Sequence, residues 1–267
     1  MTIEEILANR ELATLKKKSE VQKSDLSAVL FDAVSKAAAD NITTLEVLIY
    51  EATVSRKRNE FMFEQYKNGF VLNHSVGMRY VKIFFCYDND APEYAADKEN
   101  YNKYYPQILN KEAADARSYF WAITEAKNIE GSAVVKGSNF LTPVLSVEVI
   151  DEDTIKVKCA ISPSNILDSH GDVHIPGLWK KAVNEGQYDL LLQEHEMDFD
   201  KVITDSVSGD LKVYTENIAV KELLSRFTVA NKNIGAAAGT PNDEPPAGTQ
   251  KSNDLPTVDW SKVLNNF

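Results

Sequence analysis

The chain has 267 residues, of which 43% are hydrophobic and 26% charged, enough apolar sequence for one large domain or two small ones. The net charge of −11 would repel a phosphate backbone, so duplex nucleic acid is not an expected partner. No apolar run approaches the ~20 residues of a membrane-spanning helix, and the acidic start MTIEEILANRE lacks the apolar core of a secretory signal.

The N-terminal residues, 1–40, are expected to form a helical arm. Thr2 and Glu5 match a capping box, and a second apolar stripe at helical spacing follows. This pattern fits either a pair of helices packed on the core or a detachable arm that binds a partner. The stripe comprises Leu26, Val29, Leu30, Ala33, Val34 and Ala37.

The middle of the chain, 41–228, has the pattern of a strand-rich α+β domain. Alternating, β-branched runs predict strands, and Gly or Asn-Gly stops predict helix ends. We expect strands at 42–54, 70–88, 120–135 and 188–195, helices at 58–69, 178–186 and 220–227, hairpins at 145–162 and 201–215, and helix-compatible sequence at 91–116.

The C-terminal residues, 229–267, begin with a Gly- and Pro-rich stretch that predicts a flexible linker. The last ten residues regain apolar side chains at the spacing of one helix face, namely Trp260, Val263, Leu264 and Phe267. Either a tethered docking peptide or a disordered end with a chance pattern would give this sequence.

The two cysteines, Cys86 and Cys159, each lie in an alternating apolar run. This placement favours two buried thiols on strands over a disulfide or a metal pair, and two isolated thiols fit a reducing compartment. We therefore expect a cytoplasmic protein.

Ser75 and His195 are the candidates for nucleophilic chemistry. Ser75 belongs to a polar pair that interrupts an apolar strand, and Gly77 leaves room for the close backbone approach of an oxyanion pocket. An apolar strand ends at His195, beside two glutamates whose charge would stabilise an imidazolium. Spacing alone also fits a polar strand interruption and a solvated strand end, because a serine needs a base beside it in space.

A metal site is the alternative. Asp168, His170, Asp172 and His174 lie within seven residues, and His195 could add a third imidazole, so a metal-dependent hydrolase using His170, His174 and His195 is possible. The same loop also fits plain turn chemistry. No G-x-G-x-x-G, P-loop or CxxC motif occurs, and we expect no cofactor.

Four segments together resemble the prohead (procapsid maturation) serine protease family of tailed phages, over about 41–228. NHSVGMRY is similar to the family's serine motif and LLLQEHEMDF to its histidine motif. DSHGDVHIPGLWKKAV is similar to a D-x-x-G-D-x-x-x-P-G stretch, and IEGSAVVKGSNFLTP to the E-x-S-x-V stretch after the serine.

The resemblance implies an assemblin-like fold: a β-barrel-like antiparallel core flanked by helices. It implies a serine endopeptidase, active in the procapsid in the host cytoplasm, that cleaves scaffold or capsid precursor and itself, and that forms a dimer or higher oligomer. Carried over by motif, Ser75 is the nucleophile, His195 the base and Glu130 the third member, for which His74, Asp172 and Glu194 compete. Oxyanion support would come from Val76 and Gly77, with Arg79.

The motif order departs from the family, in which the histidine segment comes first. Here the serine half (41–144) precedes the histidine half (145–228), so the chain resembles a circularly permuted member. A triad is defined by geometry and not by chain order, so permutation does not forbid activity. A capsid assembly or scaffolding protein derived from the protease, without catalysis, is the alternative function.

Overall fold

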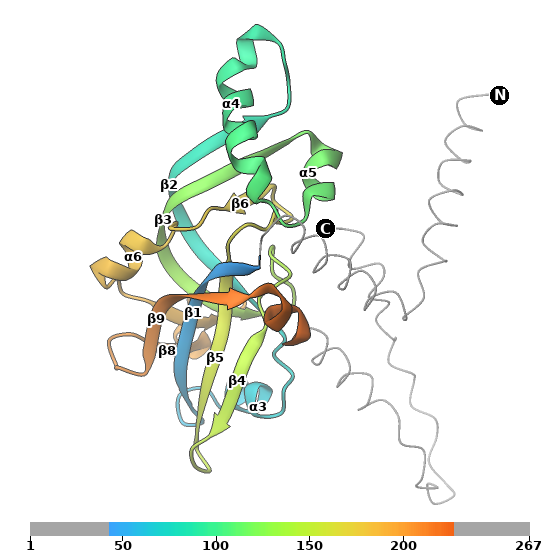
Figure 1. Ribbon diagram of the computed structural model, residues 1–267. Coiled ribbons are helices and arrows are strands. Elements are labelled where there is room, and N and C mark those ends of the chain that lie inside the picture. Colours follow the sequence, from blue (N-terminus) through green and yellow to red (C-terminus); the bar gives the residue numbers. More distant parts are fainter. Residues whose placement is uncertain (1–42, 227–267) are drawn as a thin grey trace, which may run out of the picture.

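The computed structural model describes residues 43–226, which form a mixed α+β fold dominated by strands (Figure 1). The expected N-terminal arm (1–40) and C-terminal tail (229–267) lie outside the described residues. The strands are β1 (Thr44–Ser55), β2 (Asn73–Tyr87), β3 (Tyr119–Val134), β4 (Val144–Val149), β5 (Thr154–Pro163), β6 (Asp172–His174), β7 (Leu190–Gln193), β8 (Val202–Asp205) and β9 (Leu211–Ala219).

The helices lie between these strands. They are α3 (Glu60–Lys67), α4 (Ala95–Tyr104), α5 (Lys111–Arg117) and α6 (Lys180–Glu185), with the 3-10 turns η1 (Pro92–Tyr94), η2 (Tyr105–Gln107) and η3 (Phe199–Lys201). Residues 220–226 are helical as well. None of the helices in the described ranges is long and apolar enough to cross a membrane.

The strands form two sheets. One is antiparallel with the order β4-β5-β1-β9, and the other has the order β2-β3-β7-β8, with β6 also paired to β3. The α+β class is confirmed. A β-barrel-like antiparallel core was expected; residues 43–226 form no closed barrel, and β3 pairs in parallel with both β6 and β7.

A shared apolar core joins the two sheets. Side chains of β1 and β5 pack with side chains of β3 and β7, and α3 and α6 contribute Phe63 and Ala182. Trp179, just before α6, is buried in the same core. Removing this apolar surface from water is the main stabilising term for such a fold.

Strands β2 and β3 form a long curved ribbon that extends beyond the rest of the sheets (Figure 1). Near its far end, α4 covers one face, where Tyr101 and Tyr104 pack with Phe120 and Cys86. Both cysteines are buried and free, as expected. At its near end the ribbon joins the shared core, and this end carries Ser75.

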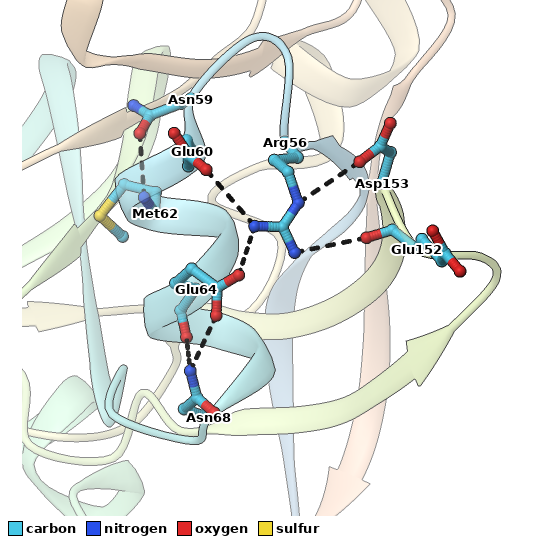
Figure 2. A network of polar contacts seen from close by, with 8 residues as sticks. All are labelled: Arg56, Asn59, Glu60, Met62, Glu64, Asn68, Glu152 and Asp153. Atoms are coloured by element: carbon cyan, nitrogen blue, oxygen red, sulfur yellow. Dashed lines mark hydrogen bonds and ion pairs between the residues drawn. The ribbon is translucent and has the colours of Figure 1, made fainter.

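An arginine network fastens α3 to the sheet (Figure 2). The Arg56 guanidinium lies 2.5 Å from Glu64 Oε1 and 3.4 Å from Asp153 Oδ1, which ties α3 to the β4–β5 turn. Asn59 caps the helix, because its Oδ1 accepts from the Met62 amide at 2.9 Å. The helix ends at the expected Asn68-Gly69 stop, where Gly69 has a φ of 72°.

The other predicted elements are largely present. The 145–162 hairpin is β4 and β5. The 201–215 hairpin is wrong, because β8 pairs with β7 in one sheet and β9 pairs with β1 in the other. The turn that we expected to close a hairpin instead carries the chain between sheets, and the Asp205 carboxylate at its start accepts from the Ser208 amide at 2.8 Å.

Candidate functional site

The pairing of β2 with β3 places four residues on one face of the ribbon. Ser75 lies opposite Ser132, and Gly77 lies opposite Glu130. Side chains alternate along each strand, and directly opposed residues share a face. Their neighbours Val76 and Ala133 pack into the shared core on the other face, so Ser75, Gly77, Glu130 and Ser132 face away from that core.

A sharp turn after β7 brings His195 over this face. β7 runs parallel beside β3 and ends at Gln193, opposite Ala133. Glu194 and His195 then adopt positive φ angles of 50° and 62°, which non-glycine residues rarely do. Hydrogen bonds hold the turn: the Glu194 amide donates to the Ala133 carbonyl at 2.9 Å, and Glu194 Oε1 accepts from the Val135 amide at 2.5 Å.

The His195 ring and the Glu130 carboxylate form the central contact of the site. His195 Nδ1 lies 2.6 Å from Glu130 Oε1. The Glu130 side chain is 3% exposed and that of His195 is 42% exposed, so a buried carboxylate meets a partly open imidazole. The hydrogen bond to Glu130 raises the pKa of His195 above its ordinary value, partial burial opposes this, and the charges of Glu130 and Glu194 add to the rise.

Ser132 links the carboxylate to the turn. Its hydroxyl donates to Glu130 Oε2 at 2.5 Å and accepts from the His195 amide at 3.1 Å. Ser132 is fully buried. It is the serine of the E-x-S-x-V stretch and was given no role there, although its position two residues after Glu130 on a predicted strand places both side chains on one face.

Gly77 makes room for the carboxylate. A Cβ at this position would lie 2.1 Å from Glu130 Oε1, well inside van der Waals contact. The space that we expected to serve a substrate oxygen is thus filled by the third candidate residue. An oxyanion role for the backbone amides of Val76 and Gly77 stays a prediction.

An open pocket of about 260 Å³ lies in front of these residues. Ser75 and His195 both line it. The remaining lining residues come from the loops after β3 and before β6: Lys136, Gly137, Ser138, Ser169 and His170. Of these, only His170 was singled out in the sequence, as a possible metal ligand beside His195. Ser75 is partly buried, and within residues 43–226 no hydrogen bond joins its Oγ to the His195 ring.

The competitors for the third position are engaged elsewhere. His74 is buried on the core face, where Nε2 lies 3.0 Å from the Tyr66 hydroxyl and burial lowers the pKa of His74 to about 4. Asp172 accepts from the Tyr80 hydroxyl. The Glu194 carboxylate is bound by the Val135 amide, so of these acids and bases Glu130 is the one that contacts the His195 ring.

The loop considered as a metal site does not assemble one. His174 is buried, with Nδ1 2.7 Å from Ser162 Oγ, and burial lowers the pKa of His174. His170 and His195 line the pocket, but His174 does not. Within the described residues, no group of at least three His, Cys, Asp or Glu side chains is arranged to hold a metal ion.

Arg79 lies farther along β2, is exposed and is not among the residues that line the pocket. The ribbon has a bulge between Gly77 and Met78, because Gly77 opposes Glu130 whereas Met78 opposes Asn128. Arg79 therefore follows an irregularity that alternation in the sequence does not reveal. An oxyanion role for its guanidinium stays a prediction.

No family model, curated protein or solved structure matches this chain.

Gly77→Ala should separate the carboxylate from the ring. The added methyl group meets the far end of the Glu130 side chain, which can shift, so we expect a folded protein in which Glu130 no longer contacts His195 Nδ1. The pKa of His195, followed by NMR titration of the full chain, should fall toward about 6.5. Gly69→Ala is the control for a methyl group added without a clash, because no atom lies within 4 Å of its Cβ; its positive φ makes this variant less stable, but it should leave the pKa of His195 unchanged. An unchanged pKa in Gly77→Ala would contradict the assignment.

Glu130→Gln tests the charge of the pair. A neutral amide cannot stabilise the imidazolium as a carboxylate does, so the pKa of His195 should fall relative to the wild type. The sign for stability follows: the raised pKa stabilises the fold fully below about pH 6.5, and this contribution is lost as pH rises through the folded-state pKa. The stability difference between wild type and Glu130→Gln should therefore shrink from pH 6 to pH 9 in chemical denaturation. A constant difference would show that the ion pair is not its source.

Proposed function

We propose that this protein is a serine endopeptidase in which Ser75 is the nucleophile, His195 the general base and Glu130 the residue that orients the base. The observation that carries the proposal is the 2.6 Å contact between His195 Nδ1 and Glu130 Oε1 beside a pocket that Ser75 also lines. A nucleophile, a base and an acidic residue that orients the base are the parts that acyl transfer by a serine requires.

The tautomer follows from the contact. A carboxylate only accepts hydrogen bonds, so Nδ1 of His195 must carry a proton and donate a hydrogen bond to Glu130. In the neutral ring Nε2 is then the unprotonated nitrogen, which is the form a general base needs. Because Glu130 raises the pKa of His195, the neutral ring forms at a higher pH than in an unperturbed histidine, and activity should rise with pH through that pKa.

In the proposed reaction Ser75 Oγ attacks a scissile carbonyl while Nε2 of His195 takes its proton. The imidazolium returns that proton to the leaving amine, and an acyl-enzyme ester remains on Ser75. Water then attacks the ester, again with His195 as base, which releases the acid and restores the serine. The reaction requires that substrate binding bring Oγ and Nε2 into contact, since catalytic hydrogen bonds often tighten only in the complex.

The resemblance to prohead proteases extends the proposal to substrate and place. We propose that the substrates are scaffold and capsid precursor proteins, and the chain itself, within the assembling procapsid in the host cytoplasm. An assemblin-like fold with permuted halves and a homo-oligomeric state belong to the same proposal. They rest on the four motifs in the sequence.

A capsid assembly or scaffolding protein without catalysis is the second candidate. It is favoured by one observation, that in the described part of the chain Ser75 Oγ makes no hydrogen bond to His195. In that case the His195–Glu130 pair would be a structural remnant of the protease.

Ser75→Ala decides between the two. Wild-type full chain, incubated alone and with a library of proteome-derived peptides, should generate new termini, including cuts within 228–257, that mass spectrometry detects. Ser75→Ala should lose this cleavage by at least about 10³-fold, since removing a triad member leaves only residual rate enhancement, and it should keep its unfolding temperature. An intact wild-type chain beside an uncut library would favour the scaffolding function. Cleavage that persists in Ser75→Ala and stops with a chelator would favour a metal enzyme.

A further inference from the structure

The hydroxyl of Ser132 contacts both Glu130 and His195, the residues that orient and form the proposed base. It donates to Glu130 Oε2 at 2.5 Å, and it accepts from the backbone amide of His195 at 3.1 Å. The first contact fixes the carboxylate whose other oxygen holds the His195 ring. The second fixes the backbone of His195 itself. The Ser132 side chain therefore fixes both the backbone position of His195 and the carboxylate that orients its ring.

This double contact matters because the His195 turn is strained. Glu194 and His195 are consecutive non-glycine residues with φ of 50° and 62°. A residue held in the left-handed region costs free energy and persists only where its surroundings fix it. At His195 the backbone amide is held by its hydrogen bond to the Ser132 hydroxyl. Without it, the turn would keep the contacts of Glu194 but lose the one that holds the His195 amide, so that the ring would shift relative to Glu130.

Ser132 is not itself a candidate nucleophile. It is fully buried, and its hydroxyl proton is directed at Glu130 Oε2. Ser75, directly opposite on β2, lines the pocket, whereas Ser132 does not. The pairing of two serines across the ribbon thus separates two tasks, with one side chain open to a substrate and the other committed to the carboxylate and the turn.

We propose that Ser132 is a positioning residue that holds Glu130 and the strained His195 turn in the geometry that activates Ser75. This proposal rests on the proposed function for the catalytic consequence, but the positioning itself is independent of it. A merely structural serine would stabilise the fold and leave the properties of the His195 ring unchanged. A positioning serine sets those properties.

The test compares Ser132→Ala with wild-type full chain by two measurements. The first is the pKa of His195 from NMR titration, which should fall toward about 6.5 because the carboxylate and the turn are no longer held. The second is the rate at which a fluorophosphonate, a serine-directed probe, modifies Ser75. Its maximal rate should fall by about 10²-fold, the effect of a roughly 1 Å misplacement, while the probe concentration for half-maximal rate stays constant.

Ser162→Ala is the matched control. Ser162 is also a buried strand serine with two side-chain contacts, accepting from Trp179 Nε1 at 3.1 Å and lying 2.7 Å from His174 Nδ1, but it does not line the pocket. It should lower the unfolding temperature and leave the pKa of His195 and the labelling rate unchanged. Ser132→Thr, which keeps the hydroxyl, should restore most of both properties that Ser132→Ala loses.

The outcomes separate the two proposals. If Ser132→Ala leaves both the pKa of His195 and the labelling rate unchanged, or if Ser162→Ala alters them equally, the positioning role is refuted while the proposed function stands. If wild-type Ser75 is not labelled, the proposed function fails, and the pKa comparison still decides whether Ser132 positions His195.

Discussion

The contact between the His195 ring and the Glu130 carboxylate is the interaction on which the rest of the site depends. It joins a residue of β3 to a residue of the turn after β7, which are far apart in the sequence. This contact explains several features of the sequence around it. Gly77 lacks a side chain where the carboxylate lies, Ser132 binds its second oxygen, and the turn after β7 adopts unfavourable backbone angles to place the ring above it. The strained backbone angles lower the stability of the fold, and such strain is common at functional sites.

The sheet topology explains how Ser75 and His195 come to line the same pocket although their segments are in reverse order relative to the family motifs. β3 is the shared neighbour: it pairs with β2, which carries Ser75, and with β7, which leads into His195. Glu130 and Ser132 on β3 therefore lie between the two, and either segment can come first in the chain. This is the physical reason why a permuted motif order is compatible with a working site, as long as the order of strands in the sheet is kept.

Strand and helix positions could be predicted largely from the sequence, because alternation, capping residues and glycine stops are local. Pairing could not: the 201–215 segment has the pattern of a hairpin, yet β8 and β9 join different sheets. The Glu130–His195 contact was expected from the resemblance alone, since nothing in the spacing joins them. That Ser132 shares a face with Glu130 could be predicted from the alternation of side chains along a strand. The place of Lys136 beside the pocket could not be predicted, because loops that meet only in the folded chain carry no periodic signal, and His170 was grouped with His195 only as a possible metal ligand.

If Glu130 and His195 make Ser75 a nucleophile, as we propose, covalent labelling of Ser75 must depend on pH and on His195. Full-length protein would be treated with a fluorophosphonate from pH 5 to 9, and the adduct located by peptide mapping. We expect a single adduct on Ser75, with a rate that rises through a pKa above about 6.5 and that is lost in His195→Ala but not in His170→Ala. An adduct on another serine, or labelling of Ser75 at the same rate in His195→Ala, would contradict it.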